Sequence, residues 1–179
     1  MGAPAGVLVG MAVMSATMLP SALPLVRLAA ATAGSRGHTA AVALGYAAVW
    51  AALGTAAMPL AMLGPSRQAS AAALGAAAVY QVSPFARRCL TRCRNPLARI
   101  VVGWRDGVAG GLAMGVRDGL WCTGCCAGLL VGLIAVGAVS VWGMLAFGAL
   151  AAVQKLAPFG AQAGVAFALA LAVGALVLL

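Results

Sequence analysis

Long runs without charge constrain this chain more than any other feature of its sequence. Stretches free of Asp, Glu, Lys and Arg cover residues 3–26, 37–66, 68–86, 119–154 and 156–179. A membrane span needs about 20 apolar residues, so four of these runs hold one helix each. The run 119–154 is long enough for two helices, with a turn expected near residues 136–140.

Overall composition points the same way. Hydrophobic residues make up 64% of the chain and charged residues 7%, whereas about a quarter of the residues of a soluble domain are charged. The sequence therefore predicts an all-α fold, a polytopic transmembrane helix bundle that forms a single integral membrane domain over residues 1–179. We expect about six membrane-spanning helices plus a short amphipathic helix at the cytoplasmic surface.

The expected spans are bounded by charged or turn-forming residues. The first three expected spans are Pro4–Leu28, Ala40–Leu63 and Ala69–Val82, and the last two are Val141–Leu156 and Phe159–Leu179. The fourth is expected to begin before Gly119 and to include part of Asp106–Asp118. Ser83 followed by Pro84 is typical of a helix start. We therefore expect the short surface helix over Phe85–Arg94, ending before Asn95-Pro96.

The positive charge is unevenly distributed along the chain. Seven arginines separate the third and fourth expected spans: Arg87, Arg88, Arg92, Arg94, Arg99, Arg105 and Arg117. Cytoplasmic loops concentrate Lys and Arg, which places this loop, Arg27, Arg36 and Lys155 inside and Arg67 outside. We expect a multi-pass protein of the inner (plasma) membrane with both termini on the outer side. The chain has a net charge of +9, and we expect its basic residues to contact the anionic headgroups of the lipid bilayer. No nucleic acid partner is expected.

Residues 1–4 lack a basic residue, so no cleaved signal peptide is expected.

Three of the five cysteines fall within five residues, at Cys122, Cys125 and Cys126. On a helix, a turn of about 100° per residue puts them in an arc of about 120° together with Met114 and Asp118. Side chains at i, i+3 and i+4 project from one side of a helix and can point at a single atom. This group is the first candidate metal site, with Met114 and Asp118 as additional candidate ligands.

Two further groups carry soft ligand atoms. Cys89 and Cys93 lie one turn apart on the expected surface helix, among arginines that lower thiol pKa values. Met11, Met14 and Met18 form a stripe on the first span. Thiolates and thioethers suit Cu(I), with zinc as the second choice. Methionine is also an ordinary packing residue, so the stripe alone does not decide between the two roles.

Two other interpretations of the cysteines remain open. They could form a thiol–disulfide relay, although the expected topology places both groups at the reducing inner side. They could also pack as small hydrophobic residues. The single histidine, His38, is expected in a solvated link between the first two spans.

Several segments closely resemble a bacterial family described as predicted metal-binding integral membrane proteins. They are MAVMSATMLPSALP (Met11–Pro24), YQVSPFARRCLTRCRNP (Tyr80–Pro96), GWRDGVAGGLAMGVRDGLWCTGCC (Gly103–Cys126) and Gln154-Lys155. The resemblance covers nearly the whole chain and implies metal binding in a membrane. Family members often have His in place of Asp118 and Glu-Lys in place of Gln154-Lys155. They also usually carry a further N-terminal span and a Met/Gly-rich outer loop.

The sequence thus predicts a membrane protein that binds a soft metal ion, most naturally Cu(I), for transport or for delivery to a cuproprotein. In this scheme Cys122, Cys125 and Cys126 are the primary ligands. Cys89 and Cys93 collect or release the ion at the surface, and Met11, Met14 and Met18 line its route. The alternative functions are a non-catalytic subunit of a larger membrane complex, bound to a partner membrane protein, and the thiol relay. The chain has no nucleotide-binding loop and no acid/base constellation, so no enzyme is expected.

Overall fold

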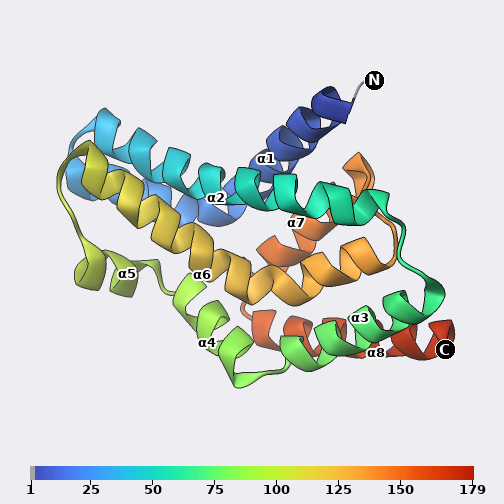
Figure 1. The fold of residues 1–179 in the computed structure, drawn as a ribbon. Helices are drawn as coiled ribbons and strands as arrows, with labels where there is room; N and C mark the ends of the chain where they lie inside the picture. The colour runs from blue at the N-terminus through green and yellow to red at the C-terminus, as the bar shows by residue number, and fades with distance from the viewer. Residues whose placement is uncertain (1–2) are drawn as a thin grey trace.

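A computed structural model describes residues 3–179, and the described chain folds entirely into helices (Figure 1). Their order is α1 (Ala3–Ala33), α2 (Arg36–Met62), α3 (Arg67–Gln81), α4 (Pro84–Cys93), α5 (Pro96–Gly103), α6 (Gly107–Ala135), α7 (Val141–Leu156) and α8 (Gly160–Leu178). The all-α prediction is confirmed, and the expected turn near residues 136–140 separates α6 from α7.

Helix starts follow local capping chemistry. The Ser83 side chain accepts a hydrogen bond from the Ala86 amide, and Pro84 occupies the first turn of α4, as predicted. A second short helix, α5, was not expected. Asn95 caps it through the Ala98 amide and Pro96 occupies its first turn. An Asn-Pro pair that ends one helix is equally suited to start the next, since a first-turn proline needs no amide donor.

Only some of the expected spans have full spanning length. Helices α1, α2, α6 and α8 contain stretches long and apolar enough to cross a bilayer. Helices α3 and α7 have 15 and 16 residues, which is about 22–24 Å at about 1.5 Å per residue. This is short of the roughly 30 Å of a bilayer's hydrocarbon core. By length, four of the six expected spans therefore qualify.

Helix α6 occupies the centre of the fold, with α2 along one side and α3 and α4 along the other (Figure 1). Its glycines permit this close approach. A Cβ on Gly115 would overlap the Val42 carbonyl oxygen of α2. A Cβ on Gly128 would lie 2.6 Å from Gln81 Oε1 and 3.0 Å from the Ala77 carbonyl oxygen of α3. These glycines therefore let α2 and α3 pack closely against two sides of α6.

The remaining helices complete the bundle around α6. Helix α1 packs on α2 and α7, and α3 lies beside α8 (Figure 1). The largest core cluster brings α1, α2, α4, α6 and α7 together, and all the cysteines lie in it or pack against it. The interior of the protein is therefore organised around the cysteine-bearing part of α6.

Candidate metal centre

The three cysteines of α6 bring their sulfur atoms together in the core. The Sγ atoms of Cys122, Cys125 and Cys126 all lie within 4.8 Å of one another. Cys125 Sγ is 3.6 Å from Cys126 Sγ, and all three side chains are buried. Every described cysteine is a free thiol. The i, i+3, i+4 spacing thus produces the predicted convergence.

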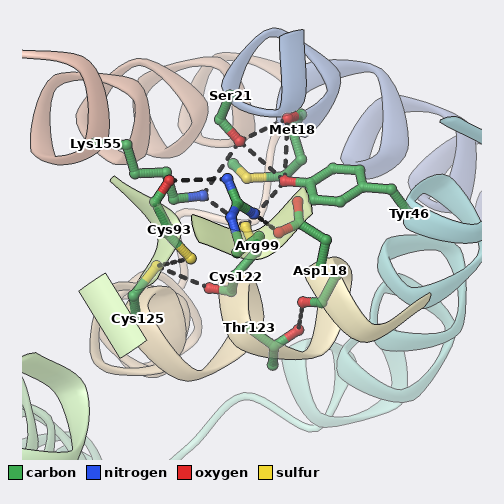
Figure 2. A network of polar contacts seen from close by, with 11 residues as sticks. Met18, Ser21, Tyr46, Cys93, Arg99, Asp118, Cys122, Thr123, Cys125 and Lys155 are labelled. Carbon is green, nitrogen blue, oxygen red and sulfur yellow. Dashed lines mark hydrogen bonds and ion pairs between the residues drawn. The ribbon is translucent and has the colours of Figure 1, made fainter. Parts of the chain in front are cut away.

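A fourth sulfur comes from α4. Cys93 Sγ lies 3.7 Å from Cys125 Sγ (Figure 2). The hydrogen bond from Cys125 lowers the pKa of Cys93 below its ordinary value. Cys89, one turn earlier, is fully buried, and its sulfur faces Gly124 of α6. Burial raises the pKa of Cys89. The two cysteines of α4 therefore differ: Cys93 joins the sulfur cluster, whereas Cys89 packs beside it.

A cation reaches the cluster from α7. Lys155 Nζ donates to Cys122 Sγ at 2.6 Å and to Ser21 Oγ at 3.2 Å (Figure 2). Lys155 is only 6% exposed, and a buried ammonium group is costly unless it is paired. Because a thiolate is the form of cysteine that can pair with it, the geometry favours an anionic Cys122.

Helix α2 supplies a second polar neighbour of Cys122. The Tyr46 hydroxyl lies 2.9 Å from Cys122 Sγ and 2.9 Å from Ser21 Oγ. It also lies 3.3 Å from the Met18 carbonyl oxygen of α1, so Tyr46 links α1 and α6. Tyr46 and Lys155 thus hold the Cys122 sulfur from two helices, whereas Cys125 and Cys126 have no cationic hydrogen-bond donor among the described residues.

An ion pair lies next to the sulfur cluster. Arg99 of α5 pairs with Asp118 of α6 and donates from Nη2 to the Cys93 carbonyl oxygen at 3.1 Å (Figure 2). The Asp118 carboxylate is thereby engaged by a guanidinium group rather than directed at the sulfurs. Arg99 connects α4, α5 and α6, which holds Cys93 in register with Cys125.

The methionines divide between two parts of the core. Met14 and Met18 are buried in the same cluster as the cysteines, and the Met18 side chain points toward Lys155 and Cys122 (Figure 2). Met11, one turn earlier, is only partly buried. Met114 packs in a separate cluster with Leu25, Ala29, Val42 and Ile100, so the structure does not bring it to the sulfurs.

The prediction of a solvated His38 is wrong. His38 lies in the first turn of α2, is 2% exposed and stacks on Trp104 with ring centroids 4.8 Å apart. Its Nδ1 lies 3.0 Å from the Gly107 carbonyl oxygen. The arginine-rich segment folds back over this end of α2 through α5, and that long-range contact is what removes His38 from solvent.

Lys155, Tyr46 and Ser21 were not predicted as site residues. A signal existed for Lys155, because it is the only charged residue after Asp118, and a lone charge in an apolar run is a functional-site candidate. In the sequence, Lys155 served as a marker of membrane orientation and as part of the family resemblance, but not as a candidate ligand or site residue. Tyr46 and Ser21 gave no comparable signal, since a tyrosine or serine in an apolar helix is common.

One comparison with known proteins identifies a family. A family model described as PpoB2, copper chaperone, matches residues 7–178. No curated protein and no solved structure matches the chain significantly.

Proposed function

The chain belongs to the PpoB2 family of copper chaperones, and from this premise we propose that it binds Cu(I) through Cys122, Cys125, Cys126 and Cys93 and delivers it to a cuproprotein. The main support for this proposal is the convergence of four free thiols. Three sulfurs lie within 4.8 Å of one another, and the fourth lies 3.7 Å from Cys125.

The sulfur spacing suits a single soft ion. Thiolates about 2.3 Å from a metal ion are about 3.8 Å apart in a tetrahedral site. The Cys125–Cys126 and Cys125–Cys93 separations of 3.6 and 3.7 Å match this value. The cluster therefore needs little rearrangement to close around an ion, and three of its members are already held on one helix.

Charge balance explains the role of Lys155. Cu(I) carries one positive charge, so two thiolates give a complex of net −1 and three give −2. An uncompensated buried anion is strongly disfavoured. The ammonium group 2.6 Å from Cys122 Sγ offsets one negative charge. Ligand thiols must also lose their protons to bind the ion, so binding releases protons and weakens at low pH.

We further propose that the protein functions in the lipid bilayer of the bacterial inner membrane, with both termini outside. The four helices of spanning length support membrane insertion, and the arginines of α4 and α5 support a cytoplasmic position for that segment. This orientation requires the shorter helices α3 and α7 to cross the bilayer as well. The sulfur cluster, which includes Cys93 of α4, then lies on the cytoplasmic side. A reporter fused to the C-terminus and active only outside the cytoplasm tests this topology, and activity of a cytoplasmic reporter at that end contradicts it.

Metal analysis of the purified protein tests the proposed function. Full-length protein purified in mild detergent should contain a stoichiometric amount of copper. Elemental mass spectrometry of samples taken before and after chelation measures this content. Substitution of Cys122, Cys125 or Cys126 by Ser should abolish that stoichiometry. Cys89→Ser is the matched control, because its sulfur faces Gly124, and it should retain the copper.

The alternatives give different results. Stoichiometric zinc with no copper would assign the same thiolates to zinc. Protein without metal that co-purifies with a stable membrane partner would favour a structural subunit. A trapped mixed disulfide through Cys122 or Cys125, again without metal, would favour the thiol relay. An unchanged copper content in the Cys→Ser variants would refute the ligand assignment.

A further inference from the structure

A cavity meets the sulfur cluster at Cys125. It has a volume of about 350 Å³ and lies between the end of α3, helix α4 and the first turns of α8. Cys125 forms part of its wall. Other lining residues are Gln81, Leu90, Thr91, Ala161 and Gly164. One ligand residue of the proposed site, Cys125, thus lies in the wall of a cavity that neither Cys122 nor Cys126 lines.

The cavity has a positive rim. Arg87 and Arg94 line it, and none of the described residues in its wall is acidic. Arg94 is anchored by Nη1, which donates to the carbonyl oxygens of Gln154 and Ala157 at 2.8 Å. Its charge is therefore fixed beside the cavity, which makes the opening attractive to an anion.

The size of the cavity limits what can enter it. The volume is near the lower limit of about 300 Å³ for small-molecule sites, which suits a tripeptide-sized ligand and excludes a folded protein.

We propose that this cavity is the exchange port of the copper site, and that its ligand is a small anionic thiol of tripeptide size. This inference rests on the proposed Cu(I) binding. The thiol enters between α4 and α8, its carboxylates face Arg87 and Arg94, and its sulfur meets the ion at Cys125. Cys122, held by Lys155 and Tyr46, is the ligand that stays.

The exchange step involves no oxidation or reduction. The incoming thiol loses its proton as its sulfur forms a bond to Cu(I), and the bond between Cu(I) and Cys125 Sγ breaks. The departing Cys125 thiolate takes up a proton, so charge and atoms balance and copper remains Cu(I). The reverse sequence loads the site from a copper–thiol complex through the same opening.

Exchange kinetics test the port. Purified full-length protein is loaded with Cu(I), and a bulky chromophoric Cu(I) chelator is added with increasing reduced glutathione. Release should rise with glutathione concentration. Ala161→Trp and Thr91→Trp, which plug the cavity from α8 and from α4, should slow release about tenfold or more, because each blocks the bound pose needed for exchange. Copper stoichiometry should not change.

The controls separate the port from general effects of substitution. Ala149→Trp fills a cavity between α1 and α7 with no cysteine in its wall and should release copper at the wild-type rate. Cysteamine, a positively charged thiol, should act more slowly than glutathione. Arg87→Gln should reduce that difference. Because Ala161 and Thr91 lie on different helices, one of the two Trp variants can still be tested if the other fails to fold.

Contrary outcomes are distinguishable. Protein that holds no copper refutes the proposed function and this inference together. Protein that holds copper but releases it equally fast in the plug variants and in Ala149→Trp refutes the port alone. Release that is independent of glutathione concentration refutes the exchange mechanism. Equal acceleration by the thiol of a folded protein refutes the small-ligand assignment.

Discussion

Replacing Lys155 by Met removes the cation that would balance the charge of the proposed copper complex, while nearly preserving side-chain volume. Lys155 Nζ lies 2.6 Å from Cys122 Sγ in a buried setting. In the copper-loaded protein, the variant leaves a net negative complex without this counter-charge. In the copper-free protein, Cys122 can take up a proton and become neutral. The substitution should therefore weaken copper binding without weakening the fold.

The magnitude follows from the distance and the burial. Opposite unit charges about 4 Å apart attract by about 4 kcal/mol at an effective dielectric constant of about 20. Net values for charged hydrogen bonds in proteins are smaller, about 1.5–3 kcal/mol. We expect a loss of about 2–3 kcal/mol of binding free energy, which is about a 30- to 150-fold increase in Kd. The thermal unfolding temperature of the copper-free protein should stay equal or rise, because replacing a buried ion pair by apolar packing is often neutral or stabilising.

Competition for Cu(I) against a chromophoric chelator measures the Kd, and thermal unfolding in the same detergent measures the stability. Lys155→Arg keeps the positive charge and should retain most of the affinity. Arg67→Met is a matched removal of a cation at the far end of the protein, where Arg67 donates to the Leu178 carbonyl oxygen, and should leave Kd unchanged. A Kd for Lys155→Met within threefold of wild type, or a loss of affinity that only parallels a loss of stability, would falsify the counter-charge argument.

Three further outcomes are expected. Cys93, whose pKa is lowered, should be alkylated at a lower pH than Cys89, whose pKa is raised by burial; mass spectrometry after labelling across a pH series checks this, and identical pH profiles would contradict it. Asp118→Asn should lower the thermal unfolding temperature by the equivalent of about 3 kcal/mol, because its arginine partner loses its buried counter-charge, while copper stoichiometry measured on the same sample stays unchanged. Gly115→Ala should destabilise the protein by about 1–3 kcal/mol through overpacking, whereas Gly75→Ala, with no atom within 4 Å of the added Cβ, should be neutral or stabilising; chemical unfolding compares the two.

Much of the fold was determined locally, since the charge-free runs mark the long helices and the Ser83-Pro84 pair marks the start of α4. The spacing of Cys122, Cys125 and Cys126 also determined their convergence, because three residues on one helical face need no tertiary contact to point the same way. The unexpected α5 shows the limit of such signals. Asn95-Pro96 both ends α4 and begins α5. Proline disfavours a helical conformation at the residue before it, but it also suits the first turn of a following helix, and only the first of these effects was used in the prediction.

Tertiary structure decided which other groups reach the sulfurs. Cys93 and Cys89 are equivalent in sequence terms, yet the packing of α4 on α6 brings only Cys93 into sulfur contact with Cys125. Lys155 and Tyr46 approach Cys122 from helices far away in the chain, and His38 is buried by a segment that follows it by many residues. Local sequence fixes helix periodicity and end capping, because both depend on neighbouring residues. The relative placement of helices depends on which faces pack together, and only that placement assembled the four thiols, the ammonium group and the cavity beside Cys125.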